Sequence, residues 1–225
     1  MNSLEDDAKL KTLLARLHAQ SEAQEKGIIA WARANMPKPG IVLSEAQEAE
    51  FDRYFRDKLV ALEPDKAAFC YALCRALQAK RVVEAGTSFG VSTLYLAAAI
   101  RDNGGGTVIA TEYEPEKAKK ARAHFAEAGL SQFVDLREGD LRETLKTIEG
   151  PVDFLLMDIW TPMARPAMER IAPHMRKGAI VIADNVTTFR SDYAEYFDFL
   201  NDPANGFMTQ ILPFDGGLAM SVKVA

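Results

Sequence analysis

The chain has 225 residues, of which 48% are hydrophobic and 26% are charged, and its net charge is −5. This length and apolar content suit a single α/β domain, and the acidic balance argues against a nucleic-acid surface. The apolar runs fall short of the roughly 20 residues that a membrane span needs, and the acidic N-terminus has no secretory apolar core. We therefore expect a cytoplasmic protein that binds neither nucleic acid nor membrane.

Residues 1–80 are predicted to form helices that precede the main domain. Four leucines at helical spacing mark the buried face of the first helix: Leu10, Leu13, Leu14 and Leu17. The proline and glycine residues of 36–40 end that helix, and the segment 31–41 is expected to cover a substrate pocket. Ser44 and Gln47 form a capping box for a second helix that reaches Leu62, and Pro64 begins a third that runs to about Ala79.

From residue 81 onward, strands and helices alternate. Strands are predicted at 82–85, 107–112, 133–137, 152–158 and 179–184, helices at 91–100, 116–128, 164–175 and 191–200, and a closing hairpin at 207–212 and 218–224. Apolar strands that alternate with helices indicate a parallel sheet covered on both faces. The hairpin would add an antiparallel edge, so residues 1–225 are expected to form one domain with its core at 81–225.

A glycine turn follows the first predicted strand in the sequence EAGTSFG, residues 84–90. Strand, glycine turn and apolar helix, in that order, place a helix N-terminus and free backbone N–H groups beside a ligand. The spacing Gly86-x-x-x-Gly90 differs from the dinucleotide fingerprint G-x-G-x-x-G, so it favours a nucleoside ligand that has no pyrophosphate. Gly86, Thr87, Ser88 and Gly90 are therefore predicted to bind a cofactor.

Acidic side chains stand at the ends of four predicted strands, namely Glu84, Glu112, Asp158 and Asp184, and Asn185 follows the last of them. In parallel sheets, ligands bind at the carboxyl ends of the strands. Glu112 is placed to accept hydrogen bonds from ribose hydroxyls. Asp158, Asp184 and Asn185 offer hard oxygen ligands, which favour Mg²⁺ or Ca²⁺. Each of these residues taken alone could instead cap a helix or a turn.

Two further places in the sequence, residues 140–141 and Trp160, have more than one interpretation. Asp140 could cap the helix that begins near Leu141, or this pair could contact an adenine ring from the end of the third strand. Trp160 follows the fourth strand and could stack on the adenine, line the substrate pocket or pack in the interior. We count all three residues as candidate cofactor contacts.

With these residues in view, the chain resembles the S-adenosylmethionine-dependent O-methyltransferases of the catechol and caffeoyl-CoA type over roughly residues 60–225. The segments that are similar to the family's motifs, in order, are VVEAGTSFGVSTLYLA, TEYEP, VDFLLMDIW, KGAIVIADNV and DGGLAMSVK. The resemblance implies an α/β fold: a doubly wound, Rossmann-like sheet of seven strands, mostly parallel with an antiparallel last strand, and an N-terminal helical extension.

The resemblance also implies a site. The family's cofactor contacts map onto Glu84, Gly86, Ser92, Glu112, Tyr113, Asp158 and Trp160. Its divalent metal, Mg²⁺ or another such as Ca²⁺ or Mn²⁺, maps onto Asp158, Asp184 and Asn185, and we assign the catalytic role to Asp158. The family usually has a lysine after the fourth strand as the base, but here Thr161 stands in that position.

The implied function is metal-assisted methylation of a small hydroxylated substrate, either catechol-like or phenolic. A metal would hold a substrate oxygen beside the methyl group and favour the oxyanion. Because Thr161 is no base, three alternatives stay open: a metal-independent N- or C-methyltransferase of the same fold, a non-catalytic cofactor-binding module, and a dinucleotide-dependent oxidoreductase, which the glycine spacing opposes. A homodimer through the aromatic helices 45–62 and 191–200 is also open.

Overall fold

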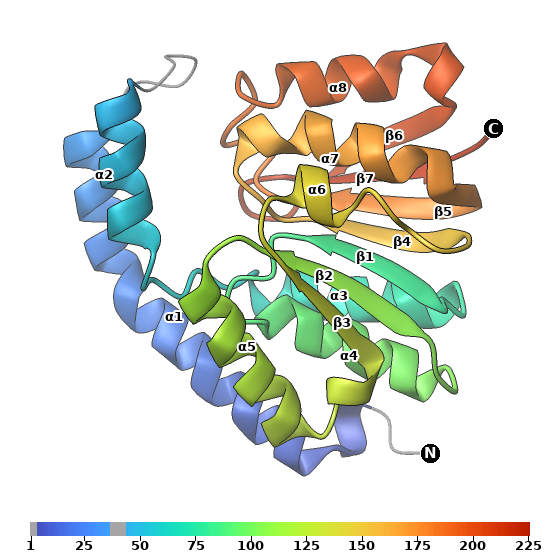
Figure 1. Ribbon diagram of the computed structural model, residues 1–225, viewed down its shortest axis with the longest axis horizontal. Helices are drawn as coiled ribbons and strands as arrows, with labels where there is room; N and C mark the ends of the chain where they lie inside the picture. Colours follow the sequence, from blue (N-terminus) through green and yellow to red (C-terminus); the bar gives the residue numbers. More distant parts are fainter. Residues whose placement is uncertain (1–3, 37–43) are drawn as a thin grey trace.

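A seven-stranded sheet forms the centre of the computed structural model, which describes residues 4–36 and 44–225 (Figure 1). The strand order is β3-β2-β1-β4-β5-β7-β6, and only the pairs that involve β7 are antiparallel. The strands are β1 (Arg81–Ala85), β2 (Thr107–Glu112), β3 (Val134–Glu138), β4 (Val152–Met157), β5 (Met175–Ala183), β6 (Phe207–Leu212) and β7 (Leu218–Lys223). This order confirms the predicted doubly wound sheet with one antiparallel strand.

Helices cover both faces of the sheet. They are α1 (Ala8–Asn35), α2 (Glu45–Phe55), α3 (Pro64–Ala76), α4 (Val91–Asp102), α5 (Pro115–Ala128), α6 (Leu141–Thr144), α7 (Ala164–Ile171) and α8 (Ala194–Asn201). Short 3₁₀ turns lie at Leu4–Asp6, Ser131–Phe133, Thr161–Met163, Ala172–His174 and Pro203–Asn205. Neighbouring strand residues face opposite sides. In β1, Val82 belongs to the core that includes residues of α1, α3, α4 and α5, whereas Val83 belongs to a second core that includes residues of α6, α7 and α8.

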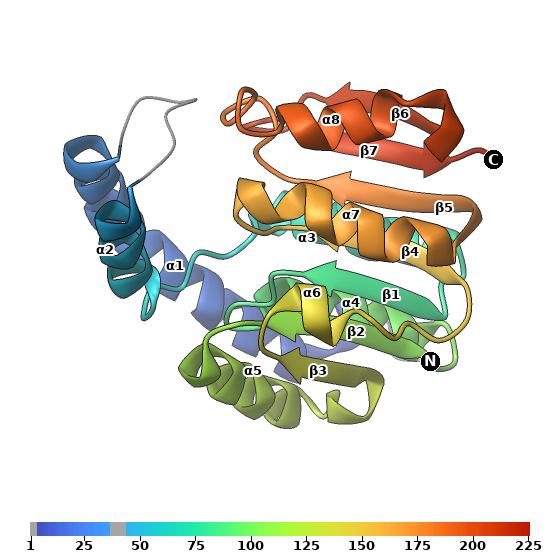
Figure 2. The same cartoon turned by 45° about the horizontal axis from the view of Figure 1, so that its top comes forward.

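The N-terminal helices extend beyond the sheet. The buried leucines at positions 10, 13, 14 and 17 confirm the predicted apolar face of α1. Arg16 on α1 forms an ion pair with Glu127 on α5, 2.7 Å apart. The far half of α1, with α2 against it, projects on the side toward which the arrowheads of β1, β3 and β5 point (Figure 2). The carboxyl ends of the parallel strands therefore face these two helices.

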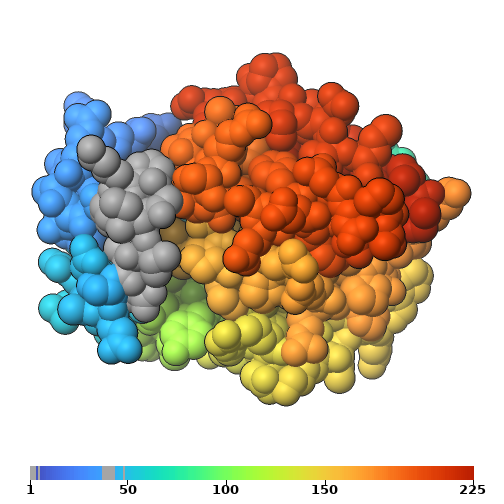
Figure 3. Space-filling model, turned by 90° about the horizontal axis from the view of Figure 1, so that it is seen from above, coloured from blue at the N-terminus to red at the C-terminus, as the bar shows by residue number. Residues whose placement is uncertain are grey.

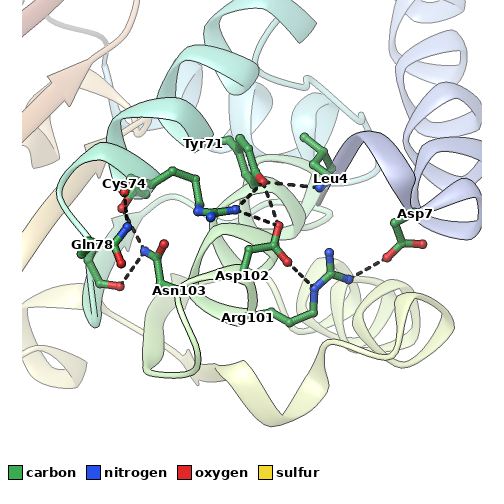
Figure 4. Close-up of polar contacts among 10 residues, drawn as sticks. Leu4, Asp7, Tyr71, Cys74, Gln78, Arg101, Asp102 and Asn103 are labelled. Atoms are coloured by element: carbon green, nitrogen blue, oxygen red, sulfur yellow. Dashed lines mark hydrogen bonds and ion pairs between the residues drawn. The ribbon is translucent and has the colours of Figure 1, made fainter. Parts of the chain in front are cut away.

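A polar network fixes the start of α1 to α3 and α4 (Figure 4). Arg101 donates hydrogen bonds to Asp7 at 2.6 Å and to Asp102 at 2.8 Å. The hydroxyl of Tyr71 donates to Asp102 at 2.7 Å, and Arg75 donates to that hydroxyl at 3.1 Å. The Asp102 side chain is only 3% exposed, so these contacts are shielded from competing water. They anchor the projecting helices at one end.

The second helix is shorter than the sequence suggested, because α2 ends at Phe55 rather than at Leu62. The residues that follow run along α1 instead. The backbone N–H of Leu59 donates to the Gln24 side chain at 3.2 Å, and the N–H of Ala61 donates to Ser21 at 3.1 Å. Side chains of α1 thus satisfy backbone groups that a longer helix would have paired internally.

Other element boundaries also moved. The helix expected at 164–175 ends at Ile171, because Pro173 interrupts it and a 3₁₀ turn follows. β5 begins at Met175, earlier than expected. The strand includes Gly178 at φ +81°, and its register with β4 is irregular there. The last helix begins at Ala194 rather than at 191. Residues 37–41 of the expected pocket cover lie outside the described residues. No helix within 4–36 and 44–225 has the length and apolarity needed to cross a bilayer.

Candidate active site

The glycine turn after β1 allows three elements to approach one another closely. Gly86 has φ +94°, and a Cβ there would lie 2.0 Å from the backbone oxygen of Asp158 at the end of β4. Gly90 has φ +81°, and a Cβ there would lie 2.5 Å from the ring of Phe125 on α5. Both positions therefore require glycine for packing as well as for backbone conformation. Cofactor binding by the turn stays a prediction.

Glu84 ties this turn to the first turn of α4. Its carboxylate is fully buried and accepts hydrogen bonds from the hydroxyls of Thr87 at 3.0 Å, Ser92 at 2.7 Å and Thr93 at 2.5 Å. Burial raises the pKa of Glu84 to about 7, although the three hydroxyls favour the charged form. Since Thr87 and Ser92 both donate to Glu84, the role of these three residues in shaping the turn is visible, and their contact with a cofactor stays a prediction.

Glu112 joins the end of β2 to the same turn. Its carboxylate accepts hydrogen bonds from the backbone N–H of Ser88 at 2.6 Å and from that of Glu114 at 2.8 Å. Each carboxylate oxygen has a second acceptor site, so Glu112 can still accept a hydrogen bond from a ligand hydroxyl. Tyr113 beside it is 70% exposed and available to a ligand. The end of β2 thus lies against the turn, as the sequence predicted.

The ends of β4 and β5 add two further carboxyl groups. The backbone N–H of Asp158 donates to the Ala85 oxygen of β1 at 3.1 Å, and that of Asp184 donates to the Met157 oxygen of β4 at 3.2 Å. Burial raises the pKa of Asp158 well above its ordinary value, and the neighbouring charges of Asp184 and Glu84 raise it further. The structure therefore brings the predicted strand-end acids of β1, β4 and β5 into one cluster.

Lys66 on α3 enters this cluster, and the sequence analysis missed it. Its ammonium lies 2.7 Å from Asp184 Oδ1 and 2.9 Å from Glu63 Oε2, and the side chain is only 1% exposed. Burial lowers the pKa of Lys66, but the two carboxylates outweigh burial and raise it. The available signal was helical spacing: Lys66, Cys70 and Cys74 stand four residues apart on the buried face of α3.

The donors around Asp184 do not fit a divalent cation as they are arranged. Asp184 Oδ1 accepts from Lys66, and Oδ2 accepts from the side-chain nitrogen of Asn185 at 2.8 Å. Across residues 4–36 and 44–225, no three or more His, Cys, Asp or Glu side chains are grouped to hold a metal ion. The metal site expected at Asp158, Asp184 and Asn185 stays a prediction that this arrangement does not favour.

The remaining predicted contacts lie at the rim of the site. Asp140 caps α6 by accepting from the backbone N–H of Arg142 at 2.8 Å, which confirms the capping interpretation, and Leu141 is buried beneath it. Trp160 is 49% exposed and packs edge-on against Phe51 and Phe55 of α2, with ring centroids 4.4 and 5.2 Å apart. Trp160 therefore connects α2 to the end of β4. Contact of these residues with adenine is untested.

Two open cavities lie on the described part of the molecule. One of about 350 Å³ lies on the N-terminal helices, and its wall includes Trp31 and Tyr54, whose rings stack on each other with their centroids 4.1 Å apart. The other, of about 390 Å³, has Gly216 in its wall, and a Cβ on Gly216 would lie 2.4 Å from the side-chain oxygen of Asn185. Figure 3 shows the N-terminal helices on one side of the molecule and the C-terminal part of the chain on the other. Among the described residues, the walls of these two cavities do not include the strand-end acids or Lys66.

Comparison with known proteins agrees with this architecture. A methyltransferase domain family matches residues 83–186. Catechol O-methyltransferase of Mycobacterium tuberculosis is 30% identical over 151 residues, which cover 67% of this chain and 65% of that protein. Catechol O-methyltransferase of Niastella koreensis is 30% identical over 131 residues, which cover 56% of this chain and 58% of that protein. The chain thus spans less than two thirds of each of these relatives.

Solved structures share the fold. Cofactor-bound Rv0187 of M. tuberculosis superposes with a TM-score of 0.71 at 23% identity, covering 99% of this chain and 93% of that one. The O-methyltransferase of Bacillus cereus in complex with SAH superposes with a TM-score of 0.68 at 20% identity, covering 92% of this chain and 99% of that one. Residues 83–186 thus match a methyltransferase domain, and by its motifs, its sheet and these relatives the chain is similar to the S-adenosylmethionine-dependent class I O-methyltransferases of the catechol and caffeoyl-CoA type.

Proposed function

We propose that this protein transfers a methyl group from S-adenosylmethionine to a hydroxyl oxygen of a small catechol-like or phenolic substrate. The observation that carries the proposal is the convergence of the ends of β1, β2, β4 and β5. There the glycine turn, Glu112, Asp158 and Asp184 meet at one edge of the sheet. The names of the relatives, catechol O-methyltransferase among them, support this choice of substrate class.

The cofactor side of the site is assigned to the glycine turn and Glu112. When bound, S-adenosylmethionine supplies an electrophilic methyl group on its sulfonium. Glu112 would accept hydrogen bonds from the ribose hydroxyls, because its carboxylate is already oriented by the N–H groups of Ser88 and Glu114. Gly86, Gly90 and Ser92 shape the turn beside it. Tyr113 and Asp140, which lie at the rim, are assigned to the adenosine half.

The substrate side is assigned to Asp158. Unlike Asp184, the Asp158 carboxylate has no hydrogen-bond or ion-pair partner among the residues that the structure describes. It is therefore the group left to accept the hydrogen bond and then the proton of the attacking hydroxyl. Thr161, at the family's usual lysine position, has no basic group to do this. Orienting the hydroxyl in line with the methyl group would supply much of the rate.

The acidic cluster carries its own cation in Lys66, so we assign these roles without a divalent metal. The same observation keeps metal-independent transfer to nitrogen as the second candidate. A homodimer stays a prediction that sedimentation can check. The aromatic faces proposed for it are engaged within the chain, since Phe51 and Phe55 pack on Trp160, and Tyr193 and Tyr196 are buried.

Methyl incorporation from labelled S-adenosylmethionine into catechols, hydroxycinnamates, flavonoids and aromatic amines tests the proposal. We expect oxygen methylation and an Asp158→Asn variant with kcat lower by roughly 100-fold or more, while calorimetry shows cofactor affinity within a few-fold of wild type. Asp198→Asn, on the exposed side of α8, serves as the control and should retain full activity. A chain that binds no S-adenosylmethionine, or one that methylates only the amines, would contradict the proposed function.

A further inference from the structure

Lys66 brings a positive charge into the acidic cluster from a distant part of the chain. It lies in the first turn of α3, 118 residues before Asp184, and its side chain is almost entirely enclosed. A buried lysine is rare unless it is paired, and this one has two carboxylate partners. The ammonium therefore pairs with Asp184, which the sequence analysis assigned, with Asp158 and Asn185, to a divalent cation, and with Glu63, which it did not.

The ammonium and a divalent cation cannot share Asp184 in this arrangement. Mg²⁺ binds carboxylate oxygens at about 2.0–2.1 Å. The Lys66 nitrogen already lies 2.7 Å from Asp184 Oδ1, so a metal on that oxygen would press against a like charge. The other oxygen, Oδ2, accepts a hydrogen bond from Asn185. Metal binding would require Lys66 to leave an enclosed position and to give up two ion pairs.

The direction of the Asn185 amide agrees with this interpretation. As a metal ligand, Asn185 would have to present its side-chain oxygen to the cation. Here its nitrogen faces Asp184, while its oxygen lies against Gly216, where a Cβ would approach it to 2.4 Å. Lys66, Asp184 and Asn185 thus form one connected chain of hydrogen bonds in which the ammonium is the only cation.

We propose that Lys66 is the resident cation of this site: its ammonium takes the place of a divalent metal and fixes Asp184 and Asn185 in position. Lys66 is a positioning residue, because its side chain is too enclosed to touch a substrate. The chain thus lacks the family's usual lysine after β4 and carries a different one from α3. The effect of Lys66 on methyl transfer rests on the proposed function, whereas the claim that Lys66 prevents metal binding does not.

The proposal also narrows the substrate class. A metal favours substrates that offer two neighbouring oxygens to chelate it. An enclosed ammonium gives no such preference, and Asp158 needs only one hydroxyl. We therefore expect phenols with a single hydroxyl and catechols to be methylated with kcat/KM values within roughly tenfold of each other, a difference of about 1.4 kcal/mol.

Mn²⁺ binding, followed by electron paramagnetic resonance of the free ion, tests the exclusion of metal without any assay of activity. Wild type should bind no Mn²⁺ at millimolar concentration, and Lys66→Met should bind one ion per chain with affinity raised roughly tenfold or more. Adding Asp184→Asn to Lys66→Met should abolish that binding. Lys146→Met is the matched control, since Lys146 is an exposed lysine that pairs with Glu143 on the surface; it should behave as wild type.

Stoichiometric Mn²⁺ binding by wild type that Asp184→Asn removes would overturn the proposal. So would a Lys66→Met variant that is folded by circular dichroism and still binds no Mn²⁺. If that variant does not fold, wild type and Lys66→Arg decide the question, because both should show no Mn²⁺ binding and methyl transfer within twofold with or without EDTA. Failure to find any methylated substrate would sink the proposed function but leave the metal-binding result intact.

Discussion

The backbone N–H of Ser88 donates a hydrogen bond to the carboxylate of Glu112 at 2.6 Å, and it thereby joins the glycine turn after β1 to the end of β2. Ser88 itself has φ +50°, a conformation uncommon for a residue with a side chain. The Glu112 carboxylate therefore holds a strained turn in place and remains able to accept a further hydrogen bond.

Replacing Glu112 by alanine should weaken S-adenosylmethionine binding. A charged hydrogen bond in a shielded site contributes about 1.5–3 kcal/mol, so we expect a loss of roughly tenfold to 100-fold in affinity, measured by calorimetry. Glu138→Ala is the matched control, because Glu138 is the register partner of Glu112 on β3 and pairs with Arg122 at an exposed position. Equal affinity in both variants would remove Glu112 from the cofactor site.

Replacing Gly86 by alanine should destabilise the fold more than the same change at Gly129. Both residues have positive φ, which costs alanine about 1–2 kcal/mol. At Gly86 the new Cβ would also lie 2.0 Å from the Asp158 backbone oxygen, whereas at Gly129 it would meet no atom within 4 Å. We expect Gly86→Ala to cost about 1–3 kcal/mol more in urea denaturation. Equal costs would show that the turn does not pack against β4.

Glu84 should make the protein less stable as the pH rises. Its pKa is about 7 in the folded state, above the ordinary value of 4.5, so the folded state binds more protons between these values. The contribution of Glu84 to the free energy of unfolding should therefore be highest below about pH 4.5. It should fall by about 3 kcal/mol as the pH rises to 7.

Urea denaturation across this pH range, on wild type and Glu84→Gln, isolates the contribution of Glu84. In the variant, the free energy of unfolding should no longer show the fall with rising pH that Glu84 causes. The reason is that glutamine resembles the protonated acid and can still bond to the surrounding hydroxyls. Asp158 titrates in the same direction in both proteins, and the variant also removes the part of its pKa shift that the Glu84 charge causes, so the difference between the two profiles reports Glu84 and its coupling to Asp158. Parallel pH profiles for the two proteins would refute the assignment.

Removing only one of the two charges of the Lys66–Asp184 pair should strongly destabilise the fold. Asp184→Asn leaves the enclosed ammonium with Glu63 as its one ion-pair partner in the described part of the chain, which should cost about 3–5 kcal/mol in chemical denaturation at pH 7. Glu63→Gln is the control. Because the Glu63 side chain is 47% exposed, removing its charge from the same ammonium should lower the free energy of unfolding by less than about 1 kcal/mol.

A double variant completes this test. Lys66→Met combined with Asp184→Asn removes both charges, so it should recover most of the stability that Asp184→Asn loses, since a neutral pair of similar volume needs no compensation. If the double variant is no more stable than Asp184→Asn alone, the two side chains do not depend on each other as the structure indicates.

The sequence by itself determined the sheet and the position of the site within it. Strand–helix alternation requires a parallel sheet, and parallel strands end on the same edge, so Glu84, Asp158 and Asp184 had to converge there. Local signals were equally reliable where they were complete: the backbone N–H of Ser44 donates to the Gln47 side chain at 3.0 Å, as the capping box predicted.

Only the tertiary structure decided what faces those acids. Lys66 reaches Asp184 across 118 residues, and Trp160 packs against Phe51 and Phe55 of α2. Sequence periodicity shows which face of a helix is buried, but it does not show which residue of another element that face meets. The docking of α1, α2 and α3 against the sheet sets those pairings, because they depend on the packing of segments far apart in the chain.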